Sequence, residues 1–201
     1  MKLIPGRTAR LILSLAAPLL ICISARALEP QTLYNFQQTP YPITSPLVQG
    51  PDGNFYGTTP HGGASFNGQV LRVTPAGALT IVASDITNLA SGLVFGNDGQ
   101  LYGMTYGLTG AGIGAGFGTV FRLTTNGALT TIAAFNGTNA YNPQSGLVLA
   151  RDGNFYGVSP GGGTNGVGAL FRVTPGGTVT LLVSFDAASR APLARLTLGA
   201  E

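Results

Sequence analysis

The sequence predicts an all-β protein made of tandem four-stranded antiparallel repeats that resemble the blades of a β-propeller. Its 201 residues include 31 glycines, 44% are hydrophobic and only 8% are charged, a composition typical of short strands joined by tight turns. Two sequence phrases each occur three times, and the chain after its N-terminal segment shows no sustained 3.6-residue period of apolar side chains. We therefore expect a partial propeller of about three blades with almost no helix.

The first 27 residues differ from the rest of the chain and have the three parts of a secretory signal peptide. A basic start that includes Lys2 precedes the apolar run 11–23, and Ala25 and Ala27 supply an A-x-A-like cleavage site. An apolar run of this length is too short to span a bilayer comfortably, so we favour cleavage over an uncleaved N-terminal anchor. Residues 1–27 would then be removed. Residues 28–201 would form an exported repeat domain without a membrane span, secreted, periplasmic or at the cell surface.

Removal of the signal peptide would change the charge of the chain. Four of the ten basic residues lie within residues 1–27, so the mature chain keeps six arginines, no lysine and seven acidic residues, a net charge of −1. This balance argues against nucleic-acid binding, which requires clustered basic residues on the folded domain. Cys22, the only cysteine, also lies in this segment, so we expect neither a disulfide nor thiol chemistry in the mature protein.

Each repeat unit consists of two recurring phrases separated by a glycine-rich stretch. SPLVQGPDGNFYGTT typifies the first phrase, with its Asp-Gly pair, and VLRVTPAGALTIVAS typifies the second, with a Pro-x-Gly or Thr-Asn-Gly turn. The first phrase occupies 45–59, 91–105 and 145–159, and the second occupies 70–84, 120–134 and 170–184. These spacings predict three units at about 45–85, 91–135 and 145–185.

Each unit is predicted to fold as two hairpins. A Leu-Val strand, an Asp-Gly turn and an Asn-Phe-Tyr-Gly strand come first, and we expect a type I′ turn because Asp-Gly favours positive φ at both central positions. A Phe-Arg-Val-Thr strand, the second turn and an Ala-Leu-Thr strand follow the glycine-rich loop. Apolar residues occur on both faces of these strands, as in a sheet packed between two others. A β-solenoid is the alternative, although its coils usually run only ~20–30 residues and need no pair of hairpins.

Two partial repeats flank the three complete units. Residues 31–36 resemble a lone fourth strand, and residues 191–201 resemble the start of a truncated fourth unit, in which Leu196 matches Leu47. Propellers usually need at least four blades to close. We therefore hypothesise that the chain is a piece of a longer array, or else an open array whose exposed edges must be covered.

A set of positions recurs in all three units, and we interpret these positions as structural. The aspartates are expected to form turns rather than bind calcium, and the tyrosines to pack in the core rather than stack on a sugar. The arginines are expected to pair with an aspartate of the same or an adjacent unit, since an unpaired buried charge is costly. The recurring positions are Asp52, Gly53, Tyr56, Gly57, Arg72, Asp98, Gly99, Tyr102, Gly103, Arg122, Asp152, Gly153, Tyr156, Gly157 and Arg172.

The phrases Asp52–Thr59, Asp152–Gly157 and Phe171–Gly177 resemble the GloVer repeat, a Gloeobacter–Verrucomicrobia tandem repeat found in exported bacterial proteins. The resemblance covers nearly all of the chain after the signal peptide. The middle unit departs from the pattern at Gln100, Leu101 and Thr125. The resemblance implies a repeat array and an exported location, and it implies no catalytic residue.

Three short motifs that can carry chemistry lack the context that the chemistry requires. Gly157–Gly161 matches G-x-S-x-G, but a nucleophile elbow needs a following helix and a nearby histidine. Gly161–Gly166 matches a dinucleotide fingerprint, but no helix is expected behind it. His61, the only histidine, lacks a second His or Cys as a metal ligand. We therefore predict no catalytic residue, no metal site and no cofactor.

The expected function is that of an exported, non-enzymatic binding or structural module at the cell surface. A surface glycan or another envelope protein is the candidate partner, with the variable glycine-rich loops as the natural contact surface. The alternative is a fragment of a propeller-type enzyme, a lyase or a glycosidase. A glycosidase requires two facing carboxylates, and the seven acidic residues of the mature chain are a small supply.

Overall fold

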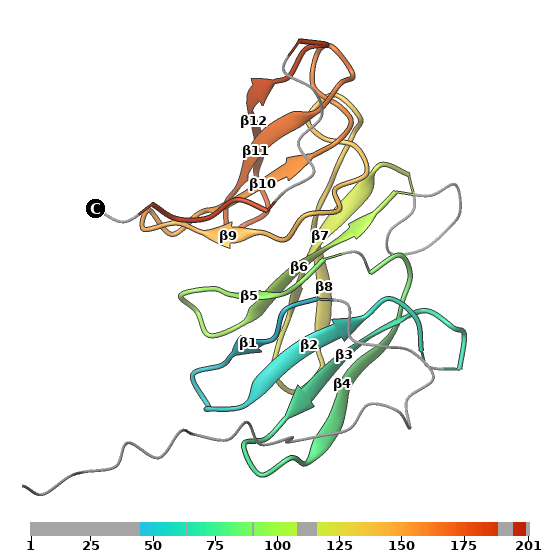
Figure 1. Ribbon diagram of the computed structural model, residues 1–201, viewed down its shortest axis with the longest axis vertical. Coiled ribbons are helices and arrows are strands. Elements are labelled where there is room, and N and C mark those ends of the chain that lie inside the picture. The colour runs from blue at the N-terminus through green and yellow to red at the C-terminus, as the bar shows by residue number, and fades with distance from the viewer. Residues whose placement is uncertain (1–44, 63, 90, 108–115, 189–194, 200–201) are drawn as a thin grey trace, which may run out of the picture. The chain divides into compact units, whose positions relative to one another are not determined.

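The computed structural model describes residues 45–62, 64–89, 91–107, 116–188 and 195–199 (Figure 1). All described residues belong to one unit, Thr32–Glu201. The predicted signal peptide and the lone strand at 31–36 lie outside the described residues, so both stay predictions. Within the described ranges there is no helix of the length and apolarity that a membrane crossing requires.

Three four-stranded antiparallel sheets follow one another along the chain, and neighbouring strands of each sheet are consecutive in sequence (Figure 1). The first sheet contains β1 (Val48–Gln49), β2 (Phe55–Thr59), β3 (Gly68–Val73) and β4 (Leu79–Ile86). The second contains β5 (Val94–Phe95), β6 (Leu101–Tyr106), β7 (Gly118–Leu123) and β8 (Leu129–Ala134). The third contains β9 (Val148–Leu149), β10 (Phe155–Ser159), β11 (Ala169–Val173) and β12 (Val179–Ser184). The described residues form no helix, and the predicted all-β fold of blade-like repeats is confirmed.

The three sheets repeat the same register, so we refer to them as blades one, two and three. In each blade a tyrosine of the second strand lies opposite an arginine of the third strand. The pairs are Tyr56 with Arg72, Tyr102 with Arg122, and Tyr156 with Arg172. The pairing of third and fourth strands is irregular at the corresponding place in each blade, where an extra residue increases the local twist. The repeated sequence therefore forms a repeated geometry.

The Asp-Gly turns do not have the type I′ form that the sequence predicted. In blade one, Gly53 N donates to Gly50 O at 2.9 Å and Gly50 N donates to Asn54 O at 2.8 Å. Only the glycine of the Asp-Gly pair has a positive φ, 78°. This is a three-residue hairpin loop, in which a left-handed glycine follows a type I turn. The loop holds one residue more than a two-residue type I′ turn, so the aspartate keeps an ordinary backbone conformation.

Neighbouring blades pack face to face and bury a hydrophobic cluster between them. We call the face toward the next blade along the chain the forward face, and the face toward the preceding blade the backward face. The forward faces of blades one and two present, respectively, Tyr56, Val70, Val82 and Ala83, and Tyr102, Val120, Ile132 and Ala133. The backward faces of blades two and three present, respectively, Leu93, Phe95, Leu101 and Phe121, and Leu147, Leu149, Phe155 and Phe171. Apolar residues on both faces of blade two therefore serve two separate interfaces.

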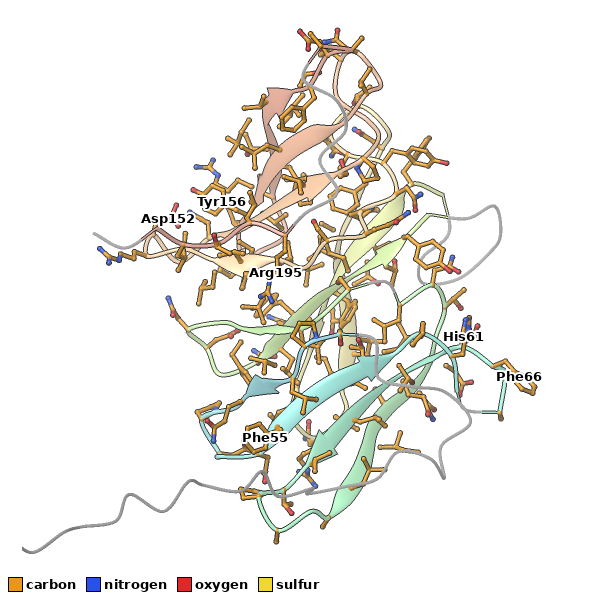
Figure 2. All side chains as sticks on the ribbon, in the orientation of Figure 1. Phe55, His61, Phe66, Asp152, Tyr156 and Arg195 are labelled. Carbon is orange, nitrogen blue, oxygen red and sulfur yellow. The ribbon has the colours of Figure 1, made fainter. Side chains whose placement is uncertain are left out.

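Residues 195–199 form no strand. The Arg195 guanidinium donates through Nη2 to Leu147 O at 3.2 Å, so this segment lies beside the start of β9 (Figures 1 and 2). The predicted fourth unit at 191–201 lies only partly within the described residues and stays a prediction.

Candidate functional site

Each Asp-Gly turn holds its aspartate in the same hydrogen-bond network. In blade one, Asp52 Oδ1 accepts the backbone N–H of Asn54 at 3.1 Å, and Oδ2 accepts the Asn54 side-chain amide at 2.7 Å and the Tyr56 hydroxyl at 2.8 Å. The same bonds join Gln100 and Tyr102 to Asp98, and Asn154 and Tyr156 to Asp152. Figure 2 shows the last aspartate and tyrosine next to each other at the turn end of blade three. The carboxylate therefore fixes the turn and orients the tyrosine.

These networks shift the pKa values of both partners. Burial raises the pKa of Tyr102 to about 12, and the hydrogen bond to Asp98 adds to this rise. Hydrogen bonds from Asn154 and Tyr156 lower the pKa of the Asp152 carboxyl. At neutral pH the tyrosine hydroxyl is thus a fixed donor, and the Asp152 carboxylate is a fixed acceptor.

The repeated arginines do not form the predicted ion pairs with these aspartates. Among the described residues none of the three repeated arginines forms an ion pair with a turn aspartate, and Nε of Arg72 and Nε of Arg172 are buried without a hydrogen-bond partner. Arg172 donates through Nη2 to Thr180 Oγ1 at 3.5 Å. The hydrogen bond to Asp152 raises the pKa of the Tyr156 hydroxyl, and Arg172 opposes that rise. In each blade the tyrosine that lies opposite the arginine donates its hydroxyl hydrogen bond to the turn aspartate.

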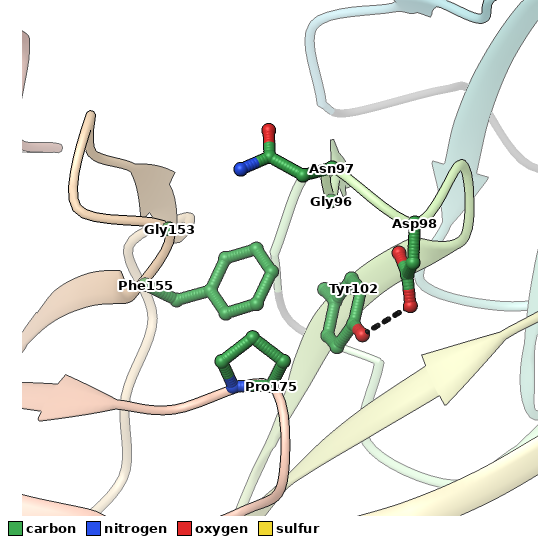
Figure 3. Close-up of a pocket in the computed structure, with 7 residues that line it drawn as sticks. All are labelled: Gly96, Asn97, Asp98, Tyr102, Gly153, Phe155 and Pro175. Atoms are coloured by element: carbon green, nitrogen blue, oxygen red, sulfur yellow. Dashed lines mark hydrogen bonds between the residues drawn. The ribbon is translucent and has the colours of Figure 1, made fainter.

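A pocket of about 270 Å³ lies between blades two and three, at the end where the tight turns gather (Figure 3). This volume is just below the ~300–1,000 Å³ typical of small-molecule sites. The lining consists of Gly96, Asn97, Asp98, Tyr102, Gly153, Phe155 and Pro175. The rings of Tyr102 and Phe155 are fully buried and form the base, with centroids 4.2 Å apart and planes tilted by 32°. Asn97, Asp98 and Pro175 form the exposed rim.

The rim of the pocket carries its hydrogen-bonding groups. Asp98 Oδ2 accepts two side-chain hydrogen bonds, from Gln100 and Tyr102, whereas Oδ1 accepts the backbone N–H of Gln100. Oδ1 therefore keeps the capacity to accept a further bond. Asn97 adds an amide that both donates and accepts, and a Cβ on Gly153 would lie 3.6 Å from its Nδ2. The pocket thus offers a carboxylate acceptor and an amide to a small polar ligand.

A family model described as the Gloeobacter/Verrucomicrobia repeat matches residues 23–201. The chain belongs to this repeat family. The match spans all three blades and confirms the resemblance that the Asp-Gly and Phe-Arg-Val phrases indicated. No curated protein matches this member of the repeat family.

Several solved structures have a similar chain path, and three of them are described as enzymes. A protein assigned as a gluconolactonase has 18% identity and a TM-score of 0.49, over 71% of this chain and 49% of that one. A luciferin-regenerating enzyme has 14% identity and a TM-score of 0.49, over 74% and 48%. A gluconolactonase from Xanthomonas campestris has 14% identity and a TM-score of 0.43, over 74% and 62%. The repeat chain spans about half the length of the first two proteins, and none of these activities carries over at such similarity.

These descriptions contradict the expectation of a non-enzymatic module at the cell surface. The similar structures are described as enzymes, which agrees better with the alternative expectation, a fragment of a propeller-type enzyme. The first expectation relied on the missing context of the short motifs and on the small number of acidic residues. Positions that differ between the units decide what chemistry the ends of the blades carry.

The three short motifs lie in surroundings that do not suit catalysis. Ser159, at the end of β10, is buried, and its hydroxyl donates to Gly161 O at 2.7 Å. A loop that contains Gly161–Gly166 follows this strand, rather than the helix that a nucleophile elbow or a phosphate site needs. His61 lies in the corresponding loop of blade one (Figure 2). The described residues contain no group of three or more side chains that could hold a metal ion.

Asn97 and Pro175 escaped prediction as pocket residues because their positions differ between the units, whereas the recurring Asp98 was predicted only as a turn former. Asn97 corresponds to Pro51 and Arg151, and Pro175 corresponds to Thr125 in the middle unit. The described parts of the glycine-rich loops, where a ligand was expected, join the other ends of the strands and do not line this pocket. Variation at the turn positions of an otherwise regular repeat is the signal that could have indicated this site.

Proposed function

We propose that the chain supplies three blades of a propeller-type enzyme and that the pocket between blades two and three holds part of the substrate. The rim of that pocket carries the proposal, because Asn97 and Asp98 line it with an amide and a carboxylate. The volume suits one ring-sized molecule, and such a pair of groups suits neighbouring hydroxyls. The substrate class is therefore a small polyhydroxylated molecule, such as a sugar derivative.

We assign Asp98 to substrate binding and orientation. A glycosidase needs two carboxylates about 5–10 Å apart, and the described lining of the pocket supplies one. The hydrogen bonds from Gln100 and Tyr102 hold this carboxylate in one orientation, which favours a positioning group over one that must move. A second acid would reach the substrate from outside this pocket.

Turnover assays on the mature chain test the proposal. The substrates are a panel of aryl glycosides and sugar lactones. We expect hydrolysis of at least one member of the panel. Asp98→Asn should lower kcat/KM by about 10-fold or more, because a hydrogen bond to a charged group contributes roughly 1.5–3 kcal/mol.

Asp52→Asn is the matched control for this substitution. Asp52 accepts the same three hydrogen bonds in blade one, but it does not line the pocket. Both substitutions should lower the Tm to a similar extent, and only the substitution at Asp98 should lower turnover. Equal losses of turnover in the two variants would contradict the assignment of Asp98. A wild-type chain that neither hydrolyses nor binds any member of the panel would contradict the proposed function itself.

A further inference from the structure

The forward face of blade three is more exposed than the same face of the other two blades. By register its members include Tyr156, Leu170 and Arg172, together with the β12 residues Leu182 and Val183. Leu182 and Val183 are 44% and 43% exposed, whereas their counterparts in blades one and two pack into the clusters between blades. Tyr156 is half-buried, whereas the tyrosines of the other two blades are fully buried. The residues of this face therefore correspond to those of an internal interface, but their side chains are more exposed.

The backward face of blade one shows the same contrast. By register its members are Leu47, Gln49, Phe55 and Leu71. Leu47 is 47% exposed, whereas its counterparts Leu93 and Leu147 are 2% and 0% exposed. Phe55 is half-buried, whereas the corresponding residues of blades two and three are fully buried. Leu71 is itself buried, so the exposed part of this face lies near β1 and the start of β2.

We propose that two copies of this chain associate head to tail, the forward face of blade three of each copy docking on the backward face of blade one of the other. The chain already forms this kind of interface twice, between blades one and two and between blades two and three. The two open faces are the two halves of a further interface of the same kind. The two faces therefore carry side chains at the positions that the internal interfaces use, with Gln49 in the place of Phe95 and Leu149.

Two copies of the described blades supply six blades, within the 4–8 that closed propellers typically have. Head-to-tail contacts between identical chains form a closed ring when the second contact returns to the first copy. Closure would cover both open faces at once. This inference does not depend on the proposed function.

The internal interfaces predict which side chains meet across the new one. Tyr56 packs edge-on against Phe95, with ring centroids 5.4 Å apart. The corresponding pair across the proposed interface is Tyr156 and Gln49 of the second copy. An amide at this position would meet the edge of a tyrosine ring that is half-buried in the single chain.

A glycine contact between blades also has its counterpart in the proposed interface. A Cβ on Gly127 would lie 2.5 Å from Val82 O, so only a glycine allows the turn of blade two to approach β4 this closely. The corresponding contact joins Gly77 of the second copy to the Leu182 carbonyl. Gly77 has a φ of 86°, the same backbone conformation as Gly127, so its turn has the shape that the contact needs.

Light scattering on the mature chain tests the proposal, and we expect a dimer. Leu47→Asp, or Leu182→Asp combined with Val183→Asp, should weaken dimerisation by about 100-fold, because each buries a charge in an apolar interface. These side chains are 43–47% exposed in the single chain, so circular dichroism should show that both variants fold. Thr131→Asp, at an exposed position of β8, is the control and should leave the dimer intact.

A mixture of the two variants distinguishes the head-to-tail mode from others. Each variant keeps the face that the other has lost, so an equimolar mixture should regain an association that neither variant shows alone. A dimer formed through blade three of both copies would be insensitive to Leu47→Asp. That insensitivity would overturn the proposal, and so would a wild-type chain that stays monomeric up to its solubility limit.

Crosslinking provides a second measurement if an aspartate variant fails to fold. The mature chain contains no cysteine, so a bismaleimide reacts only with introduced thiols. Chains that carry Tyr156→Cys should crosslink to chains that carry Gln49→Cys. Chains that carry Thr131→Cys should not crosslink to the Gln49→Cys chains, and equal yields from the two mixtures would overturn the proposal.

Discussion

A tyrosine hydroxyl completes the Asp-Gly turn of each repeat, in the place where an arginine was expected. The hydroxyl–carboxylate distance is 2.8 Å in all three blades. Tyr56 and Tyr102 are fully buried, whereas Tyr156 is half-buried. Because a buried polar group must be hydrogen-bonded to be tolerated, the aspartate that fixes the turn also allows the tyrosine to enter the core. The chain thus contains the same hydrogen bond in two environments.

Stability should fall at high pH because Tyr102 stays protonated in the folded chain. Burial first, and the hydrogen bond to Asp98 second, raise its pKa to about 12, against about 10 in an unfolded chain. The folded state therefore keeps a proton that the unfolded state loses. The stabilisation is complete below pH 10 and disappears as the pH rises toward 12. Urea denaturation should show a loss of roughly 2 kcal/mol in the free energy of unfolding between about pH 9 and pH 11.5.

Two phenylalanine variants separate this effect from other alkaline effects. Tyr102→Phe removes the titrating group, so the loss in the free energy of unfolding at alkaline pH should be smaller by roughly 2 kcal/mol. Tyr156→Phe removes a tyrosine that is only half-buried, so it should change the pH dependence less. If Tyr102→Phe and the wild type lose stability in parallel, Tyr102 is not the group that titrates.

At the scale of the hairpin, the second turn of a blade ends against the outer strand of the preceding blade. Gly127 has a φ of 98°, and a Cβ there would lie 2.5 Å from Val82 O. Gly177 has a φ of 91° and lies in the same way on Ile132 O. Each position therefore requires glycine for two reasons, the left-handed backbone and the close approach of two blades.

Gly127→Ala should therefore destabilise the chain more than Gly99→Ala. Gly99 also has a positive φ, 73°, but a Cβ there meets nothing within 4 Å, so its replacement should cost only about 1–2 kcal/mol for the left-handed backbone. At Gly127 the overlap with the neighbouring blade should add roughly 1–3 kcal/mol. Urea denaturation of the two variants measures the difference. Equal costs would show that the blades can separate slightly without loss of stability.

The repeated elements could be predicted from the sequence, and the contacts between unlike positions could not. Asp-Gly pairs and alternating apolar residues mark strands and turns locally, so three copies of one phrase were enough to predict three antiparallel sheets. The predicted turn type was wrong because Asp-Gly occurs both in two-residue loops and in three-residue loops such as 51–53, which follows Gly50. The pocket was missed because Asn97 and Pro175 meet only when two blades stack, and no spacing along the chain predicts that contact.

At the scale of the whole molecule, the charge changes sign if the predicted signal peptide is removed. The full chain carries a net charge of +3, and the mature chain would carry −1 because four basic residues and no acid lie within residues 1–27. Basic residues at the start of a signal peptide direct export, so the positive charge would then belong to targeting. The folded domain would have almost no net charge, and its association would depend on apolar faces more than on electrostatic steering.

Export in a secreting bacterial host should therefore produce a chain that begins at Leu28. Cleavage needs small residues just before the cut, and Ala25 and Ala27 supply them. N-terminal sequencing and the intact mass of the exported protein measure the outcome. Ala27→Arg should block cleavage and leave the precursor at its full mass, whereas Ala16→Val, within the apolar run, should be processed normally. An exported wild-type chain that still begins at Met1 would show that the segment is an uncleaved anchor.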